Sequence, residues 1–131
     1  MVSRNTVNMS RDIISDVLNE VMNAKRANKE FIVITKRANL LIKILDLMKQ
    51  YGYIEYEASD DKIKINIKQL NECKAIKPRY SVNKKNIEKY IRRFLPARNF
   101  GYVIISTSKG LMTHQDAQEN KIGGSLVAYF Y

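Results

Sequence analysis

The chain has 131 residues, of which 45% are hydrophobic and 27% charged, enough for one compact domain or two small subdomains. Its 23 basic and 13 acidic side chains give a net charge of +10, which predicts a polyanionic partner, either nucleic acid or an anionic membrane. No apolar run approaches the ~20 residues of a membrane-spanning helix, which disfavours the membrane. Cys73 and His114 are the only residues of their types, so a disulfide framework and a cysteine or histidine metal site are disfavoured as well. Nucleic acid in a reducing, cytosolic setting is the first hypothesis.

The first 70 residues predict the order helix, strand, helix, strand, strand. Apolar residues recur at three- and four-residue spacing in two stretches, and short β-branched or alternating runs separate and follow them. The predicted helices cover residues 11–28 and 37–50, and the predicted strands cover 31–34, 53–56 and 62–68.

After Leu70 the chemistry changes. This part predicts an edge strand over 74–80, a helix over 81–95, a strand over 102–105, a helical turn over 113–120 and a last strand over 125–131. Residues 71–131 hold 11 basic and 4 acidic side chains, a net charge of +7, whereas residues 1–70 have a net charge of +3. We therefore expect an α+β fold, with an N-terminal α-β-α-β-β subdomain (1–70) packed against a basic, β-rich C-terminal subdomain with short helices (71–131).

The run Ser106-Thr107-Ser108-Lys109-Gly110 is the strongest functional feature. Three hydroxyls, a cation and a glycine follow a predicted strand, and such a group can hydrogen-bond phosphates, sugar hydroxyls or base edges. The order of Lys109 and Gly110 is the reverse of that in a phosphate-binding P-loop. No paired nucleophile, base or metal-ligand cluster accompanies the run. We therefore predict a binding protein without cofactor, metal or small-molecule substrate, rather than an enzyme.

Basic residues elsewhere are candidates for phosphate contact. Lys25 and Arg26 end the first predicted helix, where cations either compensate the helix dipole or meet phosphate. Arg92 and Arg93 belong to the basic side of the 81–95 helix, which is either a solvated face or a phosphate-binding one. Tyr80 is either a core residue or a base-stacking one. The complete set of predicted phosphate contacts is Lys25, Arg26, Lys77, Arg79, Arg92, Arg93 and Arg98.

The pattern of residues resembles the ribosomal protein S8 family of the small subunit, over nearly the whole chain. The last third carries the most specific part, the run Ile105–Gly110 with Met112-Thr113, Ala117 and Gly123-Gly124. The opening helix is similar through Asp12, Asp16, Leu18, Asn23 and Ala24, and Gly52-Tyr53-Ile54 follows the second helix as in the family. Leu95-Pro96-Ala97-Arg98 with Phe100-Gly101 is similar to the archaeal and eukaryotic cytosolic branch, called S-fifteen-a in animals. The residues ahead of Arg11 and a short hairpin at 58–62 depart from the relatives.

The resemblance implies a two-subdomain α+β fold and a structural role in the small ribosomal subunit. It implies binding to a helix in the central domain of the small-subunit ribosomal RNA, in support of subunit assembly and translation, beside neighbouring ribosomal proteins. It also implies that Ser106, Thr107, Ser108 and Gly110 contact that RNA, and Lys109 adds a charge there. The expected location is the cytoplasm, with transit through the nucleolus if the source is eukaryotic.

Two other classes of function remain open at this point. A phosphate-handling enzyme could use the Ser/Thr run, and a free-standing RNA or DNA regulator could share the same charge. Nucleotide hydrolysis would identify the first, and sedimentation apart from ribosomes would identify the second.

Overall fold

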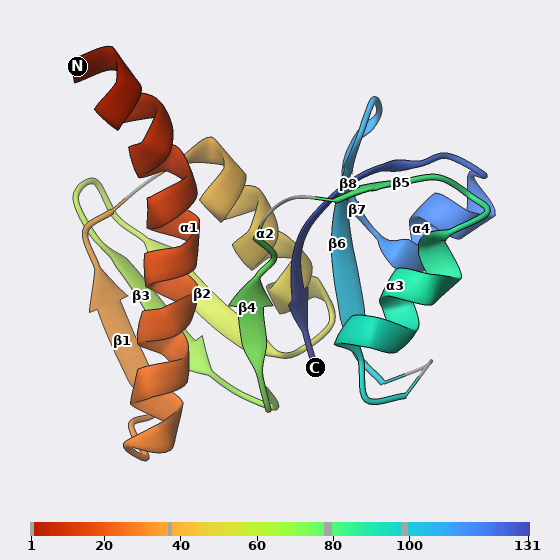
Figure 1. Ribbon diagram of the computed structural model, residues 1–131. Coiled ribbons are helices and arrows are strands. Elements are labelled where there is room, and N and C mark those ends of the chain that lie inside the picture. The colour runs from red at the N-terminus through yellow and green to blue at the C-terminus, as the bar shows by residue number, and fades with distance from the viewer. Residues whose placement is uncertain (1, 37, 78–79, 98–99) are drawn as a thin grey trace. The chain divides into compact units, whose positions relative to one another are not determined.

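The computed structural model describes residues 2–36, 38–77, 80–97 and 100–131, with side chains from Ile13 onward (Figure 1). The chain divides into two compact units, Met1–Leu70 and Asn71–Tyr131, and each has its own antiparallel sheet with helices. This mixture of helices and separate antiparallel sheets confirms the expected α+β class.

The first unit has the predicted order of elements. They are α1 (Val2–Arg26), β1 (Phe31–Ile34), α2 (Asn39–Gln50), β2 (Ile54–Ala58) and β3 (Ile63–Ile67). The strand predicted over 31–34 is confirmed residue for residue. The first helix begins earlier than predicted, at Val2 instead of Arg11, and its sequence contains no glycine or proline that would interrupt it.

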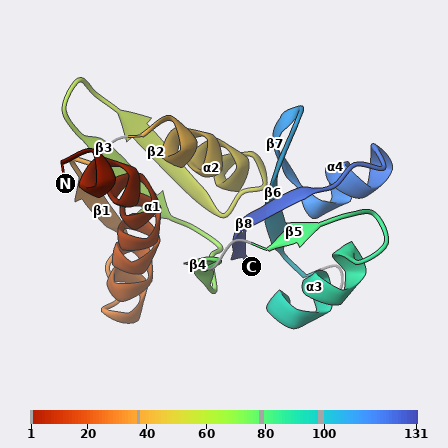
Figure 2. The ribbon, with the colours of Figure 1, turned by 45° about the horizontal axis from the view of Figure 1, so that its top comes forward.

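The sheet of the first unit has the order β1-β3-β2, and burial alternates over the first three residues of β3. Ile63 and Ile65 of β3 are buried while Lys64 between them is exposed, so one face is covered and the other is open. α1 contacts β1, and α2 contacts β2, on the covered side (Figure 2). The helices contribute the buried residues Val17, Leu18, Val21, Leu41, Ile44 and Leu45.

The second unit is built around a long final strand. Its elements are β4 (Cys73–Ala75), β5 (Ser81–Val82), α3 (Ile87–Phe94), β6 (Tyr102–Thr107), β7 (Gly110–Thr113), α4 (His114–Glu119) and β8 (Gly124–Phe130). The strand order is β4-β8-β6-β7, and β5 also pairs with β8. Ile87 and Ile91 of α3 bury against Val103, Ile105 and Leu126 of β6 and β8.

The predicted helix over 81–95 is wrong in its first six residues. Ser81 and Val82 form a strand that pairs with Ser125 and Gly124 of β8, and α3 begins only at Ile87. The reason is local hydrogen bonding: the Asn83 side-chain oxygen accepts bonds from the backbone N–H groups of Lys85 (2.8 Å) and Asn86 (3.0 Å). Such turns compete with helix formation. The strand expected over 74–80 is likewise shortened to β4, and Pro78 lies outside the described residues.

His114 links α4 to the sheet. Its Nδ1 accepts a hydrogen bond from the backbone N–H of Val103 (3.1 Å), and the side chain is 2% exposed. Burial lowers the pKa of His114 below its usual value, although Glu88 and Asp116 raise it in part. Thr113 caps α4, since its hydroxyl accepts a hydrogen bond from the Asp116 N–H (3.4 Å). His114 is therefore a packing residue that holds the neutral form.

Candidate nucleic-acid interface

The run Ser106–Gly110 forms the tip of a tight hairpin. Ser106 and Thr107 are the last residues of β6, Gly110 is the first of β7, and only Ser108 and Lys109 lie between the strands. The strand predicted to end at Ile105 therefore continues for two more residues. Gly110 has φ of +107°, a conformation that side-chain-bearing residues rarely adopt, so glycine is required for this turn. The cluster is held by a β-ladder on both sides.

The three hydroxyls of this tip have different environments. Thr107 Oγ1 donates a hydrogen bond to the Gly110 carbonyl (2.8 Å) and accepts one from the Lys109 N–H (3.1 Å). Among the residues that the structure describes, the side chains of Ser106 and Ser108 make no hydrogen bond. Ser108 and Lys109 are exposed, and Ser106 is half-buried. Thr107 thus fastens the turn, while Ser108 and Lys109 face solvent.

A fourth hydroxyl, on Ser125, is brought to this end of the sheet by the fold. Ser125 in β8 pairs directly with Ser106 in β6. The strands approach closely beside this pair, because a Cβ on Gly124 would lie 2.1 Å from the Ser106 carbonyl oxygen. Ser125 was not predicted from the sequence. The glycine pair at 123–124 was the available signal, since consecutive glycines mark close backbone approach.

Two of the predicted cations, Lys77 and Arg93, lie at one pocket of about 130 Å³, together with Lys74. The Arg93 guanidinium lies over the rings of Tyr80 (5.4 Å) and Phe94 (5.6 Å), which fixes its direction. None of the residues described at this pocket is acidic. Lys74 was not predicted, although its exposed position next to buried Cys73 in β4 is the alternation that signals an outward side chain.

The hairpin tip and the cationic pocket lie at opposite ends of β6. Tyr129, which lines the pocket, pairs with Val103 near the start of β6, whereas the tip follows Thr107 at its end. The separation along the six-residue strand is roughly 16–20 Å, given about 3.3 Å per residue. Figure 1 shows the tip projecting from one end of β6 and the last turn of α3, which carries Arg92 and Arg93, beside the other end.

Two further predicted cations belong to the first unit. Lys25 and Arg26 form the last turn of α1 in the first unit, where Lys25 is half-buried and Arg26 exposed. Cations in that position are favoured by the helix dipole whether or not a ligand is present. Arg79 and Arg98 lie outside the described residues. Among the described residues, the structure therefore groups Lys77 with Arg93 at one pocket, while Lys25 and Arg26 lie in the other unit.

No set of three or more histidine, cysteine or carboxylate side chains within metal-binding reach occurs in the described part of the chain. None of the described helices has the length and apolar character needed to cross a bilayer.

Sequence comparison identifies the family. The family model described as ribosomal protein S8 matches residues 12–131. The chain belongs to the ribosomal protein S8 family. Among similar proteins, the small ribosomal subunit protein uS8 of Nanoarchaeum equitans is 44% identical over 129 residues, covering 94% of this chain and 100% of the relative. The uS8 proteins of Thermoplasma acidophilum (41% over 129 residues, 94% and 100%) and Neurospora crassa (38% over 125 residues, 91% and 96%) are also similar. The resemblance in the sequence is confirmed, with relatives in both archaea and eukaryotes.

Proposed function

We propose that the β6–β7 tip is the element by which this protein recognises small-subunit ribosomal RNA, in a helix of the central domain. As a member of the ribosomal protein S8 family, the protein is a structural component of the small ribosomal subunit and not an enzyme. The observation that carries the proposal is the division of the hydroxyls, in which Thr107 fastens the turn and Ser108 and Lys109 face outward.

The chemistry of the tip suits RNA. An RNA helix offers a shallow minor groove lined with 2′-hydroxyls, and irregular parts of the helix offer splayed base edges. A serine hydroxyl can donate and accept on such a surface, and its small size permits close approach. Ser106 and Ser108 supply these contacts, Gly110 keeps the turn narrow, and Lys109 adds a cation. Thr107 is a positioning residue for its neighbours.

The cations supply phosphate attraction without reading the sequence. Lys77 and Arg93 do this at the far end of β6, with Arg92 beside them on α3, and Lys74 joins this group. We retain Lys25, Arg26, Arg79 and Arg98 as further phosphate contacts. A ligand that engages both the tip and the cationic pocket must extend for roughly 16–20 Å, which a nucleic-acid helix does and a mononucleotide does not.

The partners follow from this role. We propose that the protein binds ribosomal RNA beside neighbouring small-subunit proteins, supports subunit assembly, and acts in the cytoplasmic ribosome. If the source is eukaryotic, transit through the nucleolus precedes that location. The names of the relatives, from both archaea and a fungus, support a place in the small subunit.

Sedimentation of the tagged protein in cell extract tests the cellular role. We expect the protein to travel with small subunits and whole ribosomes through a density gradient. Protein that remains at the top of the gradient, or that follows a separate nucleic-acid particle, would favour the free-standing regulator instead. Purified protein incubated with ATP or GTP is expected to release no phosphate.

A further inference from the structure

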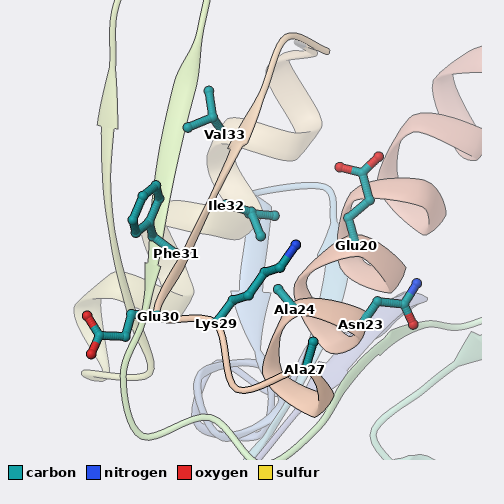
Figure 3. Close-up of a pocket in the computed structure, with 9 residues that line it drawn as sticks. All are labelled: Glu20, Asn23, Ala24, Ala27, Lys29, Glu30, Phe31, Ile32 and Val33. Carbon is teal, nitrogen blue, oxygen red and sulfur yellow. The ribbon is translucent and has the colours of Figure 1, made fainter.

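The outer edge of β1 borders a groove in the first unit. Within the part of the chain that the structure describes, β1 pairs only with β3 and is the edge strand of the sheet β1-β3-β2. Between this edge and α1 lies a hollow of about 850 Å³, lined by residues of both elements (Figure 3). Ala24 of α1 and Ala27 of the turn that follows it present small side chains, and Ile32 points toward α1 from the strand. An elongated ligand could therefore lie alongside β1.

The backbone of this edge has unmatched hydrogen-bonding groups. The N–H of Ile67 donates to the carbonyl of Glu30 (2.9 Å), so these two residues form a hydrogen-bonded pair of the antiparallel ladder. Such pairs alternate along a ladder, and the residues between them direct both N–H and C=O to the other side. In β1 those residues are Phe31 and Val33. They lie opposite Asn66 and Lys64 of β3 in non-hydrogen-bonded pairs of the ladder. The backbone N–H and C=O groups of Phe31 and Val33 thus point away from β3, toward the open edge of the sheet.

The side chains of the same two residues are unusually exposed. Phe31 is 47% and Val33 is 50% exposed, and they are two of the three large exposed hydrophobics in the described part of the chain. Edge strands are commonly protected by proline, lysine or a bulge, and the sequence of β1, Phe-Ile-Val-Ile, contains neither proline nor lysine. The strand is thus suited to pairing with a further strand.

The charge of the groove differs from that of the whole protein. Its charged lining residues are Glu20 and Glu30 against Lys29, in a chain with a net charge of +10. Glu20 is 48% exposed, and its carboxylate lies 3.9 Å from Lys36. The lining thus carries a net charge of −1, and Glu20 shares its charge with Lys36 at the rim, so this groove attracts a polyanion less than the rest of the basic chain and accepts a cationic ligand more readily.

We propose that the β1 edge and its groove bind an extended cationic peptide segment of another protein, which adds to the sheet as a fourth strand. The backbone of the segment pairs with Phe31 and Val33. Its apolar row of side chains lies beside the Phe31 ring, and its cationic row faces α1, with the aliphatic stems along Ala24 and Ala27 and the charges near Glu20. RNA cannot supply the alternating backbone donors and acceptors that this edge requires. This peptide contact is separate from RNA binding and does not depend on it.

The first test is a titration of the free protein, followed by the amide NMR signals of β1. The probe is a synthetic eight-residue peptide that alternates valine and lysine. We expect shifts and slower exchange at the Phe31 and Val33 amides. Two control peptides are N-methylated, one on the valines and one on the lysines. In the bound peptide, only every second backbone N–H faces β1, so the N–H groups of either the valines or the lysines pair with it. The control methylated on the pairing residues should lose at least tenfold in affinity, and the other control should bind within about threefold of the parent. Equal binding by both controls, or no change at β1, would overturn the proposal.

Variants at the edge test the same contact. Val33→Pro removes an N–H that faces away from β3, so it should weaken peptide binding at least tenfold with the ladder intact. Val33→Thr keeps that N–H and should bind within about twofold of the parent. If Val33→Pro fails to fold, Val33→Lys places a charge on the edge and should also weaken binding of the cationic peptide at least fivefold. Glu20→Lys should weaken the valine–lysine peptide about fivefold and leave an RNA transcript unaffected. Peptide binding unchanged by Val33→Lys and Glu20→Lys would contradict the assignment.

Two other occupants are distinguished in the same experiment. An RNA duplex added in place of the peptide should leave the Phe31 and Val33 amides unshifted, and a shift there would assign the groove to nucleic acid and overturn the proposal. Analytical ultracentrifugation of the protein alone should give a monomer. A dimer that Val33→Lys dissociates would identify a second copy as the occupant and would equally overturn it.

Discussion

The two hairpins, one in each unit, have the same construction and opposite chemistry at their tips. In the β2–β3 hairpin the Ser59 hydroxyl donates to the Lys62 carbonyl (3.0 Å). In the β6–β7 hairpin the Thr107 hydroxyl donates to the Gly110 carbonyl (2.8 Å). The first tip then exposes Asp60 and Asp61, and the second exposes Ser108 and Lys109.

The hydrogen bonds that hold each turn are distinct from the exposed groups that can meet a ligand. A hydroxyl that fastens a turn occurs in both hairpins, so the Thr107 bonds are a property of hairpin geometry and do not themselves indicate a ligand. The two tips differ in their pair of exposed side chains, Asp60 and Asp61 in one and Ser108 and Lys109 in the other. Two carboxylates repel phosphate, whereas a hydroxyl and an ammonium group attract it. The RNA-recognition proposal therefore depends on Ser108 and Lys109 more than on the whole run.

Giving the second tip the chemistry of the first should have the largest effect. The double variant Ser108→Asp, Lys109→Asp removes a hydrogen-bonding hydroxyl and replaces one positive charge with two negative ones. We expect affinity for a transcript of the ribosomal RNA central domain to fall about a hundredfold or more, as measured by filter binding. The matched variant Asp60→Asn, Asp61→Asn should bind within about threefold of the parent. An equal loss in both variants would remove the distinction between the tips.

Removing the Ser108 hydroxyl alone should have an intermediate effect. Ser108→Ala should weaken specific RNA binding by roughly 1–2 kcal/mol, because one hydrogen bond is lost and its RNA partner is left unsatisfied. The slope of log K against log salt concentration should stay the same, since no charge changes. A Ser108→Ala protein that binds the RNA like the parent would exclude this hydroxyl from the interface.

Substitution of Thr107 should lower the stability of the folded protein rather than remove a contact with RNA. Thr107→Val keeps the shape of the side chain and loses both hydrogen bonds of the turn, which should lower the free energy of unfolding by about 1–2 kcal/mol. Thr107→Ser retains the hydroxyl and should restore most of that stability. Chemical denaturation of both variants measures the difference. Ser59→Ala, which removes the equivalent bond in the other hairpin, provides the comparison. Equal stability of Thr107→Val and the parent would show that the hydroxyl does not fasten the turn.

Arg93 should contribute to RNA affinity through its positive charge rather than through recognition of RNA shape. Arg93→Ala is expected to reduce RNA affinity by about 0.5–1 kcal/mol and to flatten the salt dependence by about one unit, as for the loss of one phosphate contact. Because Arg93 also lies over the rings of Tyr80 and Phe94, thermal melting of the variant should accompany the binding curves. An unchanged salt slope would assign Arg93 to packing alone.

The smallest expected effect is a dependence of stability on pH. It distinguishes the two units, because the only histidine of the sequence, His114, belongs to the second. The pKa of His114 is lowered from 6.5 in the folded protein by burial, so unfolded chains bind a proton more readily than folded ones. Its contribution to stability is fully present above pH 6.5 and is lost as the pH falls from 6.5 toward the lowered value. The melting temperature of the parent should therefore decrease more between pH 7.5 and 5 than that of His114→Gln. Parallel pH profiles would contradict this account.

Local patterns predicted most of the fold. The apolar run 31–34 and the stripe that contains Ile87 and Ile91 correspond to real elements because burial follows period two in strands and 3.6 in helices. The start of α3 was wrong because the turn at Asn83 is formed by specific side-chain hydrogen bonds, and apolar spacing carries no information about them.

The candidate site could be predicted only in part, for a related reason. The run Ser106–Gly110 could be singled out as a candidate because its residue types are adjacent in the chain. The pocket that joins Lys74 to Arg93 depends on the pairing of β4 with β8 and of β8 with β6, between segments far apart in sequence. Residue type alone also could not show that Thr107 is engaged within the turn while Ser108 is exposed.

Site-specific photocrosslinking compares the two tips most directly. Ser108→Cys and Asp60→Cys would each be labelled with a photoactivatable aryl azide near pH 7.5, where Cys73 stays unreactive because burial, with the charge of Glu72, raises its pKa to about 12. Each labelled protein would be bound to the ribosomal RNA central domain, above its dissociation constant, and irradiated. The account predicts RNA crosslinks from position 108 and none above background from position 60. Crosslinks of equal yield from both tips, or from position 60 alone, would contradict it.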